Sequence, residues 1–180
     1  MRALVLLLLF STMHGLSETN ANRCAMGNLP AGVQELLKSN YGTLRPKTLA
    51  DLEGDGQKLW LSLNPHSCPG IAVGNFEGSG KNEYALLLIP ASGTEVEYKV
   101  VVFAAPKGSS RYTTTLLDHG TNTPDSGMVI SRVPPGKQTG FDETNSVRLK
   151  LDGINLQWLE KASVLYYYSN GAYHHLETSD

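Results

Sequence analysis

Apolar positions near the start of the chain follow the spacing of an amphipathic helix. Between residues 29 and 42, four apolar side chains fall on one face when residues are placed at 3.6 per turn: Val33, Leu36, Leu37 and Tyr41. Pro30 suits the first turn of a helix, where its missing N–H is not needed, and Gly42 suits the C-terminal end. The pattern predicts one helix at about residues 30–41.

From residue 59 onward, short apolar runs alternate with clusters of Gly, Pro, Asn and Asp. Such runs, rich in β-branched and aromatic residues and bounded by turn residues, are typical of strands. No helical spacing separates most of them, which favours antiparallel sheets over parallel strands joined by helices. A long polar connection is expected at residues 118–126. The predicted strands are 59–63, 71–74, 84–89, 97–103, 111–117, 128–133, 146–151, 155–160 and 163–168.

The last turn is specified by Asn170 and Gly171, which favour the left-handed conformations of a two-residue type I′ hairpin turn. The register that follows pairs Tyr168 with Tyr173, Tyr167 with His174, Tyr166 with His175 and Leu165 with Leu176. Alternation along each strand gathers four of these side chains into what we call the tyrosine face: Tyr166, Tyr168, Tyr173 and His175. This face either binds a glycan or protein partner or packs within the fold.

The N-terminus has the pattern of a secretory signal peptide. Arg2 supplies a positive charge, residues 3–10 form an unbroken apolar run, and small polar residues follow. We predict a signal peptide at 1–17, with its end between residues 15 and 21, followed by a single domain at 18–180. The leader predicts export to the periplasm or the extracellular space; a buried helix or a retained anchor is the alternative. No other run approaches the about 20 residues that cross a bilayer.

Composition narrows the class of partner. The chain has 180 residues, of which 41% are hydrophobic and 18% charged, with a formal net charge of −2. The apolar content is too high for a disordered chain, and the length suits one domain. The charge balance offers no broad basic surface, so nucleic acid is excluded as a partner.

The two cysteines, Cys24 and Cys68, are expected to form a disulfide, since cysteines of an exported chain usually pair. The bridge would close a loop of about 45 residues and contribute about 4 kcal/mol in the chain-entropy model. Free thiols, or a metal site that includes His66, are the alternatives. Acylation of Cys24 is disfavoured because Arg23 precedes it.

One glycine-rich loop carries oxygen-bearing side chains at alternating positions. The four candidate ligands are Asn75, Glu77, Ser79 and Glu83, and the turn between them contains Gly78 and Gly80. Several oxygens that point inward around a tight turn suit a hard cation such as Ca²⁺. The sequence therefore offers a weak Ca²⁺ candidate, with a loop that keeps only its shape as the alternative.

The segment 75–88 resembles the calcium loop of FG-GAP and VCBS-type repeats, in which aspartates normally occupy the four ligand positions. Here none of the four is aspartate. More broadly, most of the chain is similar to small exported bacterial proteins of uncharacterised function, through Cys68-Pro69-Gly70, the loop at 75–84, residues 151–154 and the hairpin at 164–173. The resemblance implies a mainly β (α+β) fold of short antiparallel strands with one N-terminal helix, comparable to one FG-GAP blade. The length excludes a full propeller.

No catalytic motif is present. The chain lacks a Gly-x-Ser-x-Gly elbow, a phosphate-binding Gly-x-x-x-x-Gly-Lys loop and a His-Glu-x-x-His helix. We therefore predict an exported, non-catalytic domain without a cofactor, apart from the Ca²⁺ candidate, that binds a protein, a glycan or an envelope component. One alternative is a periplasmic hydrolase inhibitor that inserts the loop 124–128 into an active site. The other is a small secreted hydrolase, with His119 in Asp118-His119-Gly120 as the best single acid/base candidate.

Overall fold

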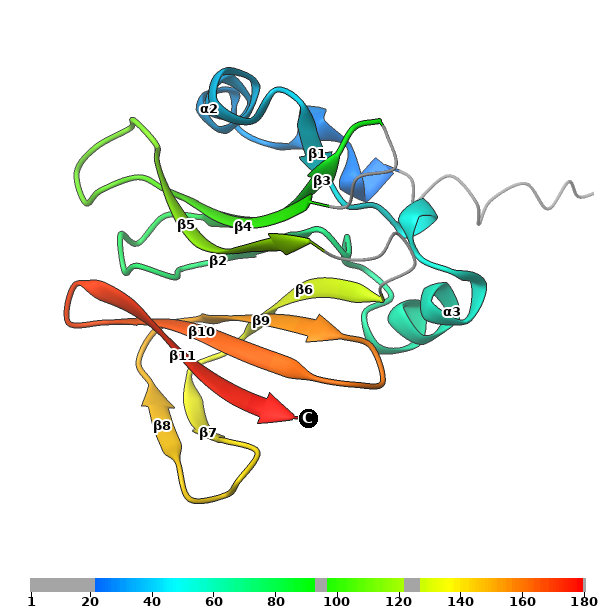
Figure 1. Ribbon diagram of the computed structural model, residues 1–180. Coiled ribbons are helices and arrows are strands. Elements are labelled where there is room, and N and C mark those ends of the chain that lie inside the picture. Colours follow the sequence, from blue (N-terminus) through cyan, green and yellow to red (C-terminus); the bar gives the residue numbers. More distant parts are fainter. Residues whose placement is uncertain (1–21, 93–96, 122–126, 180) are drawn as a thin grey trace, which may run out of the picture.

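The computed structural model describes residues 22–92, 97–121 and 127–179 (Figure 1). The predicted signal peptide at 1–17 lies outside the described residues, as does most of the loop at 124–128. In the described part, the prediction of a mainly β chain with antiparallel sheets and an N-terminal helix is confirmed.

The first sheet, called sheet A, contains five strands, all paired antiparallel. β3 and β4 lie at its centre, β1 and β2 both pair with β3, and β5 forms the opposite edge. Its strands are β1 (Leu44–Pro46), β2 (Ile71–Gly74), β3 (Glu83–Pro90), β4 (Glu97–Ala104) and β5 (Thr113–Thr121).

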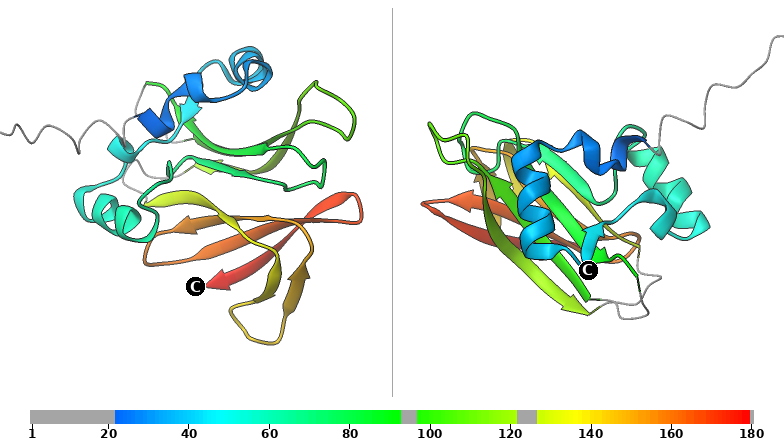
Figure 2. Two further views of the ribbon diagram at one scale, coloured as in Figure 1. Left: turned by 180° about the vertical axis from the view of Figure 1, so that it is seen from behind. Right: turned by 90° about the horizontal axis from the view of Figure 1, so that it is seen from above.

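The second sheet, called sheet B, has four strands in the order β11-β10-β9-β6. Its strands are β6 (Met128–Val133), β9 (Gly153–Trp158), β10 (Ser163–Ser169) and β11 (Ala172–Ser179). A separate hairpin of β7 (Gly136–Thr139) and β8 (Ser146–Leu149) projects from it, as Figures 1 and 2 show. β7 was not predicted.

The C-terminal hairpin has the predicted register. Tyr168 pairs with Tyr173, and the three pairs that follow also match. Asn170 and Gly171 have φ angles of 53° and 85°, the left-handed values that a type I′ turn needs. This two-residue sequence therefore determines which side chains of β10 and β11 share a face.

The predicted N-terminal helix is confirmed as α2 (Ala31–Tyr41). Its buried residues Val33 and Leu37 pack on the outer face of sheet A, against Leu86, Leu88 and other apolar side chains. Short 3₁₀ turns flank it at η1 (Asn22–Cys24), η2 (Met26–Asn28) and η3 (Leu49–Asp51).

The predicted strand at 59–63 is wrong, because these residues end the helix α3 (Gly54–Leu63). The short run from residue 59 fits helix and strand periods equally well, and the glycines before it resemble a turn. Packing decides between the two. Trp60 is buried with Leu52, Val129 and Leu159, which holds the helix against one end of sheet B.

The predicted polar connection at 118–126 is also wrong in its first part. Asp118 to Thr121 continue β5 and pair with β4, opposite Val100 and the residues before it. The register shifts at this point, between Val100 and Val101. Polar composition indicated a loop, but β4 supplies a hydrogen-bonding partner for these residues.

The two sheets stack face to face and enclose the main core, which includes Phe76, Leu87, Val100, Ile130 and Leu156. The sandwich is closed on the side of β2 and β6, where the Ile130 N–H donates to the Pro69 carbonyl at 2.8 Å. On the opposite side, β5 and β11 are the terminal strands of their sheets. The sandwich is therefore open along β5 and β11.

A groove on the open side of the sandwich

A groove of about 440 Å³ lies between β5 and the tip of the β10–β11 hairpin. We call it the tyrosine groove, because it contains all four residues of the tyrosine face. The groove is also lined by Glu77, from the loop between β2 and β3, and by Leu116, from β5. Leu116 is 47% exposed, so the groove offers apolar surface to solvent.

The tyrosine face points toward the space between the sheets. Tyr166 and Tyr173 pack against the main core, and Tyr168 meets Tyr173 edge to face with ring centroids 5.1 Å apart. Tyr166 and His175 lie side by side at 6.3 Å. Tyr166 and Tyr173 therefore both pack against the core and line the groove.

Asp118 links the two sheets beneath the groove. Its Oδ2 accepts a hydrogen bond from Tyr166 at 3.0 Å and another from Tyr98 at 3.3 Å. Burial, and then the Asp118 charge, raises the pKa of Tyr98 to about 12 and the pKa of Tyr166 further. These hydroxyls remain protonated donors. His119, the predicted acid/base candidate, is exposed and does not line the groove.

Sequence reasoning treated Asp118 as part of a loop and missed its two tyrosine partners. Alternation along 97–103 places Tyr98 on the same face as Val100 and Val102, which is a core-facing pattern. A tyrosine on such a face needs a partner for its hydroxyl, and this is the signal that points to a nearby carboxylate.

Glu77 lines the rim of the groove and lies near the buried Glu83, which does not line it. Burial, and then the charge of Glu83, raises the pKa of Glu77. Burial, and then the charge of Glu77, raises the pKa of Tyr173. The Tyr173 hydroxyl forms no hydrogen bond of regular geometry within the described residues. This rim therefore places the Tyr173 hydroxyl beside the Glu77 carboxyl group.

The loop that contains the Ca²⁺ candidate is held by its own side chains. The buried Glu83 carboxylate accepts hydrogen bonds from the Glu77 N–H at 2.6 Å and the Ser79 N–H at 3.3 Å. Asn75 Oδ1 accepts from the Gly80 N–H, and Ser79 Oγ accepts from the Lys81 N–H, both at 3.3 Å. Three of the four candidate ligands therefore stabilise the turn itself.

The described residues, the loop at 75–83 included, contain no evident cluster of metal ligands. Within residues 22–92, 97–121 and 127–179, no group of three or more His, Cys, Asp or Glu side chains is arranged to hold a metal ion. Ca²⁺ binding at residues 75–83 stays a prediction of the sequence.

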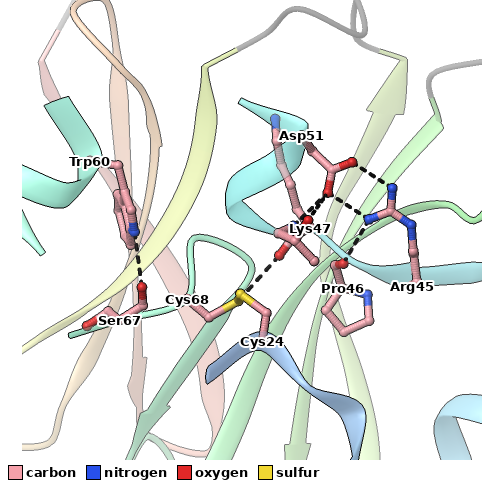
Figure 3. Close-up of a disulfide and its surroundings, with 9 residues drawn as sticks. Cys24, Arg45, Pro46, Lys47, Asp51, Trp60, Ser67 and Cys68 are labelled. Atoms are coloured by element: carbon pink, nitrogen blue, oxygen red, sulfur yellow. Dashed lines mark hydrogen bonds and ion pairs between the residues drawn. A yellow bond between two sulfur atoms is a disulfide. The ribbon is translucent and has the colours of Figure 1, made fainter. Parts of the chain in front are cut away.

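The predicted disulfide is confirmed, with a Cys24–Cys68 S–S distance of 2.03 Å (Figure 3). It ties η1 to the turn before β2, and Cys68 Sγ lies 3.4 Å from the Lys47 carbonyl oxygen. Nearby, Trp60 Nε1 donates to the Ser67 carbonyl at 3.2 Å. The bridge thus joins the N-terminal segment to the region where α3 meets β2.

Beside the disulfide, Asp51 accepts two hydrogen bonds from the Arg45 guanidinium, at 2.6 and 2.7 Å. Burial acts to raise the pKa of Asp51, but the bonds from Arg45 and Thr48 outweigh it and lower the pKa to about 2. Lys47 is only 3% exposed, and burial lowers its pKa to about 8. This charged cluster supports the fold around the disulfide.

In the described parts of the chain, no helix has the length and apolar content to cross a membrane. Comparisons with models of protein families, with curated proteins and with solved structures found nothing that matches this chain.

Proposed function

We propose that this chain is an exported, non-catalytic binding domain that holds a saccharide in the tyrosine groove. The observation that carries the proposal is the lining of the groove, where tyrosine rings stand beside a carboxyl group and an imidazole. Sugars present flat C–H surfaces that cover aromatic rings, and hydroxyl groups that need donors and acceptors at their edges. An aromatic lining with a few polar groups is the usual composition of a small-molecule site.

Size is consistent with such a ligand. The groove volume of about 440 Å³ falls within the range of roughly 300–1,000 Å³ that small-molecule sites occupy. The hydrogen bond to Asp118 already fixes the Tyr166 ring before a ligand binds. A wall that is already ordered lowers the entropic cost of binding.

The small number of carboxyl groups in the groove favours a binding site over a hydrolase site. Glycoside hydrolases generally use two carboxyl groups that flank the bond to be cleaved. Among the described residues that line the groove, Glu77 is the only one with a carboxyl group. One acidic side chain is enough to accept a hydrogen bond from a sugar hydroxyl.

Export is supported by the disulfide, because such bonds persist in oxidising compartments. It is also supported by the leader pattern at residues 1–17. A saccharide ligand fits this location, since the envelope and its surroundings are rich in glycans.

The test is a titration of the protein with short hexose and N-acetylhexosamine oligosaccharides, followed by calorimetry and by NMR. We expect saturable binding that Tyr168→Ala abolishes and Glu77→Gln weakens. Tyr167→Ala is the matched control, because Tyr167 does not line the groove, although its stacking partner His174 does. The proposal is overturned if no oligosaccharide binds, or if Tyr168→Ala and Tyr167→Ala bind equally well.

A further inference from the structure

We propose that a second pocket, beside the disulfide, binds an oxyanion attached to an apolar group. The pocket has a volume of about 490 Å³ and lies between η1, the turn after α3, and strands β2 and β6. We call it the arginine pocket after Arg23 and Arg132, which belong to its walls. It does not share a lining residue with the tyrosine groove.

The charge of the arginine pocket points to an anion. Its lining includes two arginines and His66, and none of the described residues that line it is Asp or Glu. The chain as a whole carries a formal net charge of −2, so the pairing of Arg23 with Arg132 is a local concentration of positive charge. Asn64, Ser67 and Ser131 add polar groups that can donate to the oxygens of a ligand.

Arg23 is held in place before any ligand binds. Its Nη1 donates to the Pro65 carbonyl at 2.9 Å and to His66 Nδ1 at 3.0 Å. A histidine that accepts at Nδ1 carries its proton on Nε2, so the ring offers a further donor. Neither Nε nor Nη2 of Arg23 bonds to a described residue. A fixed guanidinium whose remaining N–H groups bond to none of the described residues matches the geometry of a phosphate or carboxylate.

Arg132 has a weak competing partner. Its Nη1 lies 3.5 Å from Asp152 Oδ2, and the same oxygen accepts the Asn75 N–H at 2.8 Å. Asp152 does not line the pocket. The Arg132 side chain is 53% exposed, so it can turn toward a ligand while Asp152 keeps its bond to the backbone.

The remaining surface of the pocket is apolar. Half-buried Ile71 and Val73, which is 41% exposed, supply this surface, whereas Ala72 and Ile130 line the pocket but are buried in the core. A bare inorganic ion would leave this surface in water, whereas an apolar group next to the anion would cover it. Burial of apolar surface on binding is favourable, so such a group would strengthen the complex. The preferred ligand is therefore an organic phosphate or carboxylate.

The disulfide assembles this site. Arg23 and His66 are 43 positions apart in sequence, and each lies within two residues of a bridged cysteine. The bridge holds η1 against the turn before β2, which keeps the Arg23 guanidinium on the Pro65 carbonyl. Reduction releases η1, so the affinity for the anion depends on an oxidising environment.

The test uses phenyl phosphate, benzoate and inorganic phosphate as probes of the intact protein, with NMR titration and calorimetry. We expect phenyl phosphate to bind more tightly than inorganic phosphate, and benzoate to show whether a carboxylate serves as well. Arg23→Gln and Arg132→Gln should each weaken phenyl phosphate binding about tenfold, as loss of a charged hydrogen bond predicts. Arg148→Gln, an equal change of charge at a residue of β8 that does not line the pocket, should leave the affinity unchanged.

The inference is overturned if phenyl phosphate does not bind, or if Arg148→Gln weakens binding as much as Arg23→Gln. The role of the disulfide is tested with Cys24→Ala/Cys68→Ala, whose fold is verified by the NMR signals of the β10–β11 hairpin. Folded variant protein that still binds phenyl phosphate with full affinity would contradict that role. Tyr168→Ala, which tests the saccharide proposal, should leave phenyl phosphate binding unchanged.

Discussion

Tyr166 on β10 donates a hydrogen bond to Asp118 on β5, with 3.0 Å between Oη and Oδ2, and so connects the two sheets at their open side. Tyr98 on β4 donates to the same oxygen at 3.3 Å. The carboxylate therefore receives one donor from each sheet. Asp118 is therefore a polar link on the side of the sandwich where no backbone hydrogen bond joins described residues of the two sheets.

Tyr166→Phe should lower the free energy of unfolding by about 1–2 kcal/mol, because a hydrogen bond to a carboxylate is lost in a partly buried place. Tyr167→Phe is the control, since its ring stacks on His174 on the other face of the hairpin. Urea unfolding measures both variants. Equal stabilities for the two would contradict the importance of the link between Tyr166 and Asp118.

Gly70→Ala should destabilise the protein by about 3 kcal/mol, because overpacking forces the backbone to shift. A Cβ at this position would lie 2.2 Å from the Lys47 carbonyl oxygen and 2.5 Å from the Lys47 nitrogen. Gly54→Ala is the matched control, at the start of α3, where a Cβ meets nothing within 4 Å. It should be neutral or stabilising by roughly 0.5–1 kcal/mol. Thermal and urea unfolding decide between these outcomes.

Removal of the disulfide in Cys24→Ala/Cys68→Ala should cost about 4 kcal/mol, because a loop with a sequence separation of 44 is no longer closed in the unfolded chain. Chemical reduction of the wild-type protein should give a similar loss. A change below about 1 kcal/mol by urea unfolding would show that the bridge does little for stability and matters mainly for the arginine pocket.

Stability should fall in acid partly through Asp51. The pKa of this carboxyl is lowered to about 2 in the folded protein, against an ordinary value of 3.8. The folded state therefore gains from the ionised form above about pH 4, and the gain is lost as the pH falls toward 2. With allowance for solvent screening of Arg45, we expect about 1 kcal/mol.

Unfolding of wild type and Asp51→Asn at pH 6 and pH 2.5 measures this contribution. The wild type should lose about 1 kcal/mol more than Asp51→Asn between the two pH values. Asp55→Asn is the control, because Asp55 is 97% exposed and pairs with Lys58 at the surface. A pH dependence of Asp51→Asn that matches the wild type would exclude the Arg45–Asp51 pair as its source.

Glu83→Gln should destabilise the loop at 75–83, since an amide group replaces one of the two oxygens that accept backbone N–H groups. The expected cost is about 2 kcal/mol for a buried group. Ser79→Ala removes only the oxygen that faces the Lys81 N–H and should cost less. Melting curves in EDTA measure both variants without a contribution from metal ions.

The calcium prediction can be tested with the same proteins. An ion that binds only the folded state raises the melting midpoint as its concentration exceeds the dissociation constant. We expect excess Ca²⁺ to raise the midpoint of the wild type and to leave Glu77→Gln unchanged. A wild-type midpoint that excess Ca²⁺ does not move would leave the loop with a structural role only.

Local chemistry explains which parts of the fold could be predicted. Asn170 and Gly171 accept left-handed backbone conformations, so two residues determine the turn and with it the register of β10 and β11. Val33 and Leu37 lie one turn apart, which identifies α2 without reference to its surroundings. The Cys24–Cys68 bridge follows because the chain has only two cysteines.

Features that depend on distant contacts were not predictable in the same way. α3 is specified by the burial of Trp60 against Val129 and Leu159, and nothing in residues 59–63 indicates that contact. The part of β5 from Asp118 onward is defined by its pairing with β4, although its composition is that of a loop. Both sites also combine residues far apart in sequence, such as Glu77 with Tyr173 and Arg23 with His66.

On the closed side of the sandwich, the backbone hydrogen bond from Ile130 to Pro69 joins β6 to the turn before β2. We expect the two sheets to separate more readily along β5 and β11 than along β2 and β6, because the Asp118 hydrogen bonds and the packing of Tyr166 and Tyr173 hold the open side while a backbone hydrogen bond also holds the closed side. Amide hydrogen exchange should therefore be slowest along β3 and β6 and fastest along β5 and β11. A ligand that fills the tyrosine groove would hold the two sheets together on the open side and would slow amide exchange in β5 and β11.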